Sequence, residues 1–162
     1  MEDAVQRLQR NAWLGLLVLG VLIGIVGLWA LFIGITEDAS VPLGLTGRSL
    51  ADLAAESPDG YRFADFEVRA GGMGLALIGG VLASIAVFAF RSGHSWAWWL
   101  MWTMPIWAGA NVSLIVIVGI APGQPPPWPL ISGAIVGAIS AALLFVTAPR
   151  FFERPMLDRD SD

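Results

Sequence analysis

Long apolar runs without ionisable residues alternate along the chain with short charged stretches. The first run covers residues 12–35, and later runs cover about 70–90, 96–121 and 128–147. A hydrocarbon core of about 30 Å needs roughly 20 helical residues, because each residue adds about 1.5 Å. The pattern therefore predicts an all-α, polytopic membrane protein that folds as a bundle of four transmembrane helices.

The first run has an alternative interpretation as a cleaved signal peptide, with Arg7 and Arg10 as its basic flank. The apolar core of a signal peptide usually has about 7–15 residues, and this run is much longer. A retained helix is therefore expected. A charged side chain at the centre of a span costs about 2.5–3.5 kcal/mol on insertion scales, and none of the runs contains one.

Turn residues between the runs predict how the helices are connected. The short polar link 91–95 joins the second and third runs into a helical hairpin. Proline residues 125–127 and Pro149 flank the fourth run and are expected to mark its two ends, because proline lacks the N–H that a helix interior needs.

Arginine placement predicts the orientation. Basic residues near the run ends fall on one side of the predicted membrane, which makes that side cytoplasmic and places both termini in the cytoplasm, with the protein in the cell membrane. These residues are Arg7, Arg10, Arg91, Arg150, Arg154 and Arg159. The expected division is a cytoplasmic N-terminus 1–11, a single membrane domain 12–149 and a polar cytoplasmic tail 150–162.

The outer loop between the first two runs, residues 36–69, contains local folding signals. Ser49 and Asp52 match a capping box, which predicts a short helix over residues 50–56. Residues 57–60, Ser-Pro-Asp-Gly, predict a turn. An aromatic stretch follows, at Tyr61, Phe63 and Phe66, and is expected to lie on the membrane surface.

Charged residues next to the second run have two interpretations. Asp65 and Arg69 are four residues apart, the favourable order for an ion pair on a helix, and Glu67 lies between them. They could form a charged outer mouth for a ligand. The alternative, which we favour, is that they end the helix in water and fix its depth.

Small residues at a spacing of four predict close helix packing, because helices in lipid associate through close approach of their backbones. The first run carries Gly20 and Gly24. The fourth run has the longest pattern, with Gly133, Gly137 and Ala141 in one row and a second row of Ala134, Ala138 and Ala142 beside it. Contact within the chain is favoured over contact with another chain.

The third run is the richest in tryptophan. Trp96, Trp98 and Trp99 are expected to form an aromatic belt at the membrane interface, whereas Trp107 lies about 16 Å deeper at the helical rise. Pro105 predicts a kink that leaves the Met101 carbonyl without its usual helical partner.

Polar side chains on the same helix suggest a site or a packing contact. Thr103, Trp107 and Asn111 share one face, next to the predicted kink at Pro105. One hypothesis is a mid-membrane pocket for a small ligand, formed by these residues. The favoured alternative is hydrogen bonding from Asn111 to a neighbouring helix, at Ser84, Ser132 or Ser140.

Composition narrows the function classes. The 162 residues are 56% hydrophobic, with a mean hydropathy of +0.71 and a net charge of -4, and lysine is absent, so nucleic acid is not an expected partner. Cysteine is absent and His94 is the only histidine. The predicted spans contain no acid and base pair and no metal-ligating cluster, so neither catalysis nor a cofactor is expected.

The sequence favours a membrane protein that acts through helix contacts, as a self-associating unit or as an accessory subunit of a larger complex in the bilayer. The small-residue rows support this interpretation. The alternative is a binder or carrier of a small, mostly apolar molecule, supported by Pro105, Trp107 and Asn111.

Overall fold

The computed structural model of the chain describes residues 2–152, without the side chains of 2–5, 8 and 37, and every regular element in this range is a helix. Four helices or helix pairs are long and apolar enough to span a membrane. They are α1 (Glu2–Ile33), α4 (Pro58–Ile85) with the π-helical turn η2 (Ala86–Phe90), α5 (Ser95–Met101) with α6 (Thr103–Val118), and α7 (Trp128–Phe152). Three short helices follow α1: η1 (Gly34–Glu37), α2 (Ser40–Thr46) and α3 (Leu50–Glu56).

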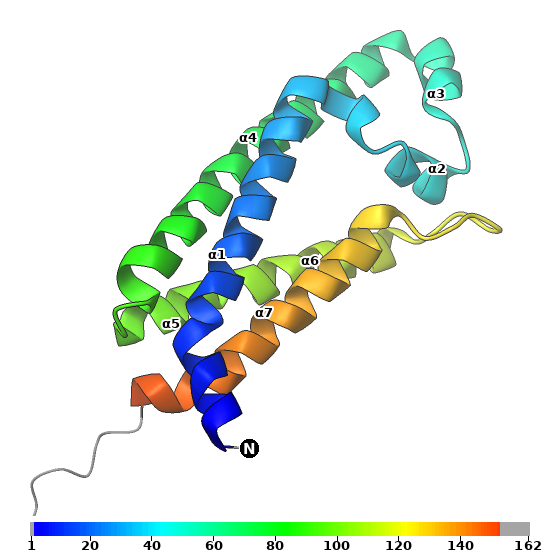
Figure 1. Cartoon of the computed structure of the whole chain (residues 1–162). Coiled ribbons are helices and arrows are strands. Elements are labelled where there is room, and N and C mark those ends of the chain that lie inside the picture. Colours follow the sequence, from blue (N-terminus) through cyan, green and yellow to red (C-terminus); the bar gives the residue numbers. More distant parts are fainter. Residues whose placement is uncertain (1, 153–162) are drawn as a thin grey trace, which may run out of the picture.

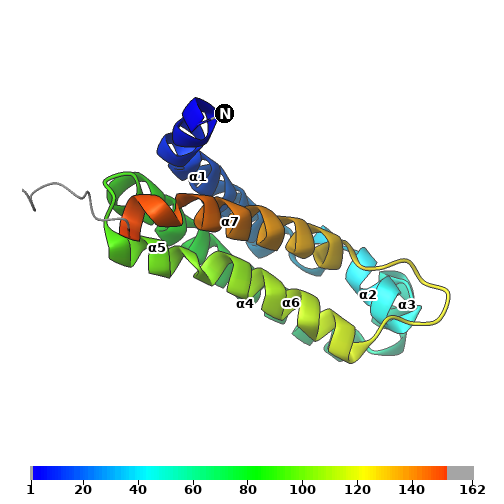
Figure 2. The same cartoon turned by 90° about the horizontal axis from the view of Figure 1, so that it is seen from below.

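The long helices form two hairpins, α1 with α4 and α6 with α7 (Figures 1 and 2). The hairpins meet at what we call the terminal end, made of residues 9–16, 85–101 and 144–152. They diverge toward what we call the loop end, made of residues 34–60 and 119–128. At the loop end α2 bridges them, because the Ala121 N–H donates to the Gly44 carbonyl at 2.8 Å and the Trp128 N–H donates to Ser40 Oγ at 2.8 Å.

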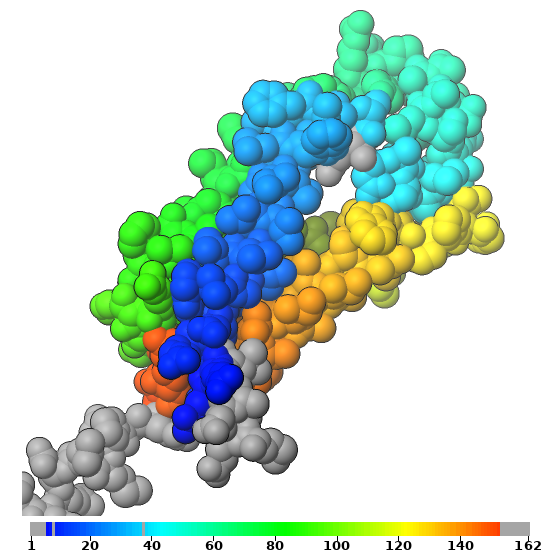
Figure 3. Space-filling model, viewed as in Figure 1, coloured from blue at the N-terminus to red at the C-terminus, as the bar shows by residue number. Residues whose placement is uncertain are grey.

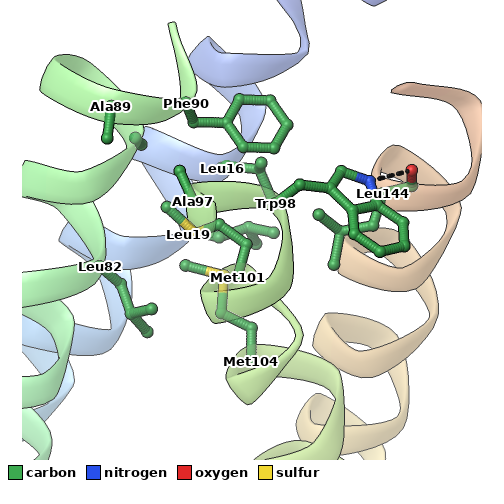
Figure 4. Close-up of a cluster of buried hydrophobic side chains, with 11 residues drawn as sticks. Leu16, Leu19, Leu82, Ala89, Phe90, Ala97, Trp98, Met101, Met104 and Leu144 are labelled. Carbon is green, nitrogen blue, oxygen red and sulfur yellow. Dashed lines mark hydrogen bonds between the residues drawn. The ribbon is translucent and has the colours of Figure 1, made fainter. Parts of the chain in front are cut away.

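The shared hydrophobic core lies at the terminal end (Figure 4). Trp98 is only 7% exposed, and its Nε1–H donates to the Leu144 carbonyl of α7 at 2.9 Å. The expectation that Trp98 belongs to an interface belt is therefore wrong, although Trp96 and Trp99 are exposed. The buried members of the core are Leu16, Leu19, Leu82, Ala86, Ala89, Phe90, Ala97, Trp98, Met101, Met104 and Leu144.

Glycine residues bring α1 and α4 into close contact. A methyl group placed on Gly79 would lie 2.6 Å from Gly24 Cα and 2.7 Å from the Gly20 carbonyl oxygen. A methyl group on Gly72 would lie 2.6 Å from the Leu31 nitrogen. These backbones can approach only because no Cβ separates them, so this pair is held by dispersion contacts between main chains.

The second long helix begins earlier than the hydropathy pattern predicts. It starts at Pro58, and Ser57 caps it by accepting the Gly60 N–H at 3.3 Å. The predicted turn at residues 57–60 is wrong, because Pro58 occupies the first helical position, where its missing N–H costs nothing. The stretch with Tyr61 and Phe66 is therefore the first part of α4.

The capping box that precedes α3 is confirmed. Ser49 Oγ accepts the Asp52 N–H at 3.2 Å, and the Asp52 carboxylate accepts the Ser49 N–H at 3.2 Å. The hydrogen bond from the Ser49 hydroxyl, assisted by the one from its backbone, holds the pKa of Asp52 below its ordinary value of 3.8. The predicted bounds of this helix, 50–56, are also those observed.

Two proline residues act differently from each other. The third predicted span is interrupted at Trp102, between α5 and α6, three residues before Pro105, which agrees with the predicted kink. Pro149 was expected to end the fourth helix, but α7 continues through it to Phe152. One missing N–H this close to the end of a helix removes a single bond, so the last turn can still form. The predicted tail lies mostly outside the described residues.

Candidate functional site

The polar stripe on the third predicted span forms hydrogen bonds within the same span, to α6 itself and to the end of α5. Asn111 Nδ2 donates to the Trp107 carbonyl at 3.0 Å, and Thr103 Oγ1 donates to the Leu100 carbonyl at 2.8 Å. Thr103 is exposed, whereas Pro105, Trp107 and Asn111 are half-buried. The expected hydrogen bond from Asn111 to a neighbouring helix is therefore wrong.

Two of the three serine residues considered as partners of Asn111, Ser84 and Ser140, bond locally as well. Ser84 Oγ donates to the Gly80 carbonyl at 2.8 Å, and Ser140 Oγ donates to the Val136 carbonyl at 2.6 Å. A hydroxyl four residues after a helical carbonyl reaches it without any tertiary contact. Such a local bond satisfies the hydrogen-bonding capacity of the side chain within its own helix. Hydropathy and residue spacing could not distinguish a local bond of this kind from a bond between helices.

Next to the loop end, Arg69 of α4 joins the end of α1. Its Nη1 donates to the Leu31 and Phe32 carbonyls at 3.0 and 2.9 Å, and its Nη2 donates to the Ile33 carbonyl at 3.3 Å. These carbonyls end a helix, where they lack helical partners and carry the negative end of the helix dipole. A guanidinium with several donors fits three converging carbonyls.

Asp65 completes this joint. Its carboxylate accepts Arg69 Nε–H at 2.8 Å and the Ile35 N–H at 2.8 Å, so the predicted ion pair is present but both partners also bond to the α1 side. Gly34 has no Cβ to collide with the Asp65 and Arg69 side chains, and its φ of 77° is in the left-handed region that favours glycine. Glu67 is exposed. The sequence did not reveal the link to the α1 side, because it joins residues thirty or more positions apart.

A second arginine joint lies at the terminal end. Arg150 of α7 donates from Nη2 to the Arg91 carbonyl at 2.6 Å and from Nη1 to the Gln9 carbonyl at 3.4 Å. Gln9 Nε2 in turn donates to the Val146 carbonyl at 3.0 Å, and the Arg91 guanidinium lies 4.9 Å from the centre of the Trp13 ring. The two hairpins are thus tied together beyond their apolar core.

The two small-residue rows of α7 face different surroundings. A methyl group on Gly137 would lie 3.4 Å from Ala108 Cβ, and one on Gly133 would lie 3.2 Å from Val112 Cγ2, so this row packs on α6. Ala141 of the same row is half-buried. The members of the other row are all exposed: Ala134, Ala138 and Ala142.

Two hollows mark the surface. Figure 3 shows an opening between α1 (blue), α2 (cyan) and the start of α7 (yellow), where the hairpins diverge. A separate hollow of about 350 Å³ lies between the end of α4 and the start of α5. Its walls are formed by Ser84, Ile85, Phe88, Ala89, His94 and Trp96.

No protein-family model, curated protein or solved structure matches the chain. Within residues 2–152, apart from the side chains not described, no three His, Asp or Glu side chains gather as metal ligands would. The features that remain for a function are the exposed apolar faces, the outward alanine row of α7 and the two hollows.

Proposed function

We propose that this is an integral membrane protein that spans the bilayer four times. Support comes from side chains that a water-soluble protein would bury: Ile117 is 80% exposed, and Phe32 is 72% exposed. Large exposed apolar surface is unfavourable in water, whereas lipid tails cover it at no cost. The four long apolar helices provide the spans.

The terminal end faces the cytoplasm in this proposal. The described charged side chains of that end are basic, with Arg91 and Arg150 at the meeting point of the hairpins and Arg10 on α1, and Arg7 lies just before it. The loop end carries acidic side chains among its basic ones, such as Asp52, which is the distribution expected of an outer face.

We further propose that the protein acts through contacts between membrane helices, as a self-associating unit or as an accessory subunit. The observation that carries this proposal is the exposed row Ala134, Ala138 and Ala142. One small-residue row of α7 packs on α6 through Gly133 and Gly137. The other row is exposed, so a helix of another chain can approach the α7 backbone closely along it.

Bulk on the outward row should abolish association without unfolding the protein. The Ala138→Leu variant is expected to shift the protein from its assembled mass to a monomer, because leucine separates backbones that alanine allows to touch. The measurement is native mass spectrometry after extraction in a mild detergent, compared with thermal unfolding of the same sample.

The matched control is Ile135→Leu, which changes shape at an exposed neighbouring position while conserving volume. It should retain the assembled mass. An unchanged mass for Ala138→Leu, with a melting temperature equal to that of the unmodified protein, would refute the assignment of the contact to this row.

A second candidate function is the carrying of a small, mostly apolar molecule. The opening between the hairpins favours it, because apolar helices border a space that reaches the loop end (Figure 3). The native mass spectra of Ala138→Leu and Ile135→Leu separate the two candidate functions. A carrier retains a bound small molecule in both variants, and its activity does not depend on the assembly state.

A further inference from the structure

Helix α2 and its C-cap join the two hairpins at the loop end through a face of small residues. Ser40, Gly44 and Gly47 follow one another at spacings of four and three, so they lie on one side of the helix. On this side Ser40 Oγ accepts the Trp128 N–H at 2.8 Å, and the Gly44 carbonyl accepts the Ala121 N–H at 2.8 Å. We call this contact the latch.

The latch is closely packed but small. A methyl group on Gly44 would lie 2.6 Å from Pro127 Cγ and 3.1 Å from the Pro125 carbonyl oxygen, and Pro127 is buried. Such an approach requires a residue without a Cβ, so the two surfaces fit each other specifically. The hydrogen bonds of the latch are formed by neutral groups, and none of the ion pairs among the described residues belongs to it.

The two sides of the latch belong to different hairpins. Helix α2 follows α1 through η1, and the next helix, α3, packs on α4, so α2 is carried by the first hairpin. Residues 119–127 connect α6 with α7 and belong to the second. Among the described residues, α6 packs on α7 and has no extended contact with α1 or α4. The hairpins are therefore joined by the core at one end and by the latch at the other, with the opening of Figure 3 between them.

We propose that α2 is a releasable latch, which opens and closes the loop end of the space between the hairpins. Two neutral hydrogen bonds and one small packing contact stabilise the closed form much less than the apolar core stabilises the terminal end, so the latch can open while the core stays intact. Gly47 and Gly119 end α2 and α6 at φ values of 71° and 89°. Glycine changes its dihedral angles at low cost, so both sides of the latch can move. The inference rests on neither of the functions proposed above, because each is compatible with a latch.

Weakening the latch should move the loop ends of the hairpins apart. The natural chain has no cysteine, so Ala51→Cys on α3 and Pro122→Cys in the α6–α7 connection provide two spin-label positions, both exposed. Double electron–electron resonance of the full chain in lipid nanodiscs measures the distance between the labels. Addition of Ser40→Ala removes the acceptor of the Trp128 N–H. The population at longer distance should then rise about fivefold, the change expected for one ordinary hydrogen bond.

Thr46→Ala is the matched control on the same helix. It also removes a hydroxyl group, but Thr46 Oγ1 donates to the Pro42 carbonyl of α2 itself, at 2.7 Å. Its distance distribution should equal that of the labelled parent. Equal distributions for Ser40→Ala and Thr46→Ala would overturn the inference. A longer distance in Ser40→Ala that is accompanied by a loss of helical circular dichroism would overturn it as well, because the core would then have opened with the latch.

A disulfide should have the opposite effect. A Cβ on Gly47 would lie 3.7 Å from Ala121 Cβ, within the range of about 3.5–4.5 Å that disulfides require. In the Gly47→Cys/Ala121→Cys variant, oxidation should slow hydrogen exchange at the Trp128 N–H about tenfold or more, because the bond excludes the separated states. The Ser57 N–H, which donates to the Leu53 carbonyl of α3 at 3.0 Å, should exchange equally in the oxidised and reduced forms.

The latch would be refuted if the disulfide does not form in the folded variant, or if the Trp128 N–H exchanges at the same rate in both redox forms. Gly47 has a left-handed backbone, which a cysteine adopts at a cost. If the double variant does not fold for this reason, the comparison of Ser40→Ala with Thr46→Ala decides the matter.

Discussion

The Gly79→Ala variant should lose about 1–3 kcal/mol of stability, the usual cost of extra volume in a packed core, although it adds only one methyl group. That methyl would lie 2.6 Å from Gly24 Cα and 2.7 Å from the Gly20 carbonyl oxygen, and both are backbone atoms. A side chain can rotate away from a clash, but a helix backbone has to move as a whole. The α1 and α4 helices would therefore separate along much of their contact.

The adjacent residue provides the control. Gly80 has no heavy atom within 4 Å of the position its Cβ would take, so Gly80→Ala should be neutral or slightly stabilising, since alanine favours helix more than glycine does. Unfolding of both variants by SDS, followed by circular dichroism, measures the difference. Equal unfolding midpoints would contradict the α1 and α4 contact described here.

The second large effect is expected for Arg69→Gln, with a loss of about 2 kcal/mol. The substitution removes the charged donors from the three carbonyls at the end of α1 and leaves Asp65 without its ion pair. Hydrogen bonds to charged groups contribute about 1.5–3 kcal/mol each, and the partial exposure of Arg69 reduces that contribution through solvent screening. Glutamine cannot reach three carbonyls at once.

Arg62→Gln is the matched substitution on the same helix. Arg62 is 84% exposed at its side chain and lies 3.9 Å from Asp59, so its loss should change stability by less than about 0.5 kcal/mol. Amide hydrogen exchange gives a local readout: Arg69→Gln should accelerate exchange at the Ile35 N–H, which donates to Asp65. The joint would be disproved by identical stabilities and exchange rates in the two variants.

Hydropathy predicted the four long helices, because the absence of charges over twenty or more residues depends on composition alone. It did not predict where α4 begins. Ser57 and Pro58 are typical both of a turn and of a helix start, and only the N-cap contact with Gly60 distinguishes the two. The early start matters, since it carries Asp65 and Arg69 on a helix that faces the end of α1.

Packing partners were less predictable than the helices themselves. Gly133 and Ala134 are neighbours in sequence and face different surroundings, so spacing could identify two small rows but not which of them would pack on α6. Residue spacing also could not show that Trp98 lies in the core, where its indole N–H donates to the Leu144 carbonyl. The π-helical turn η2 at the end of the second span has no signature in residue type.

The central claim is that the chain crosses a membrane, with the terminal end of the bundle on one side and the loop end on the other. Two single cysteines can test it. The natural chain has none, so Ala55→Cys at the loop end and Ser92→Cys at the terminal end each give one reactive group at an exposed position. In intact cells an impermeant maleimide should label Ala55→Cys and should label Ser92→Cys only after the membrane is opened. Equal labelling of both positions in intact cells would contradict the claim.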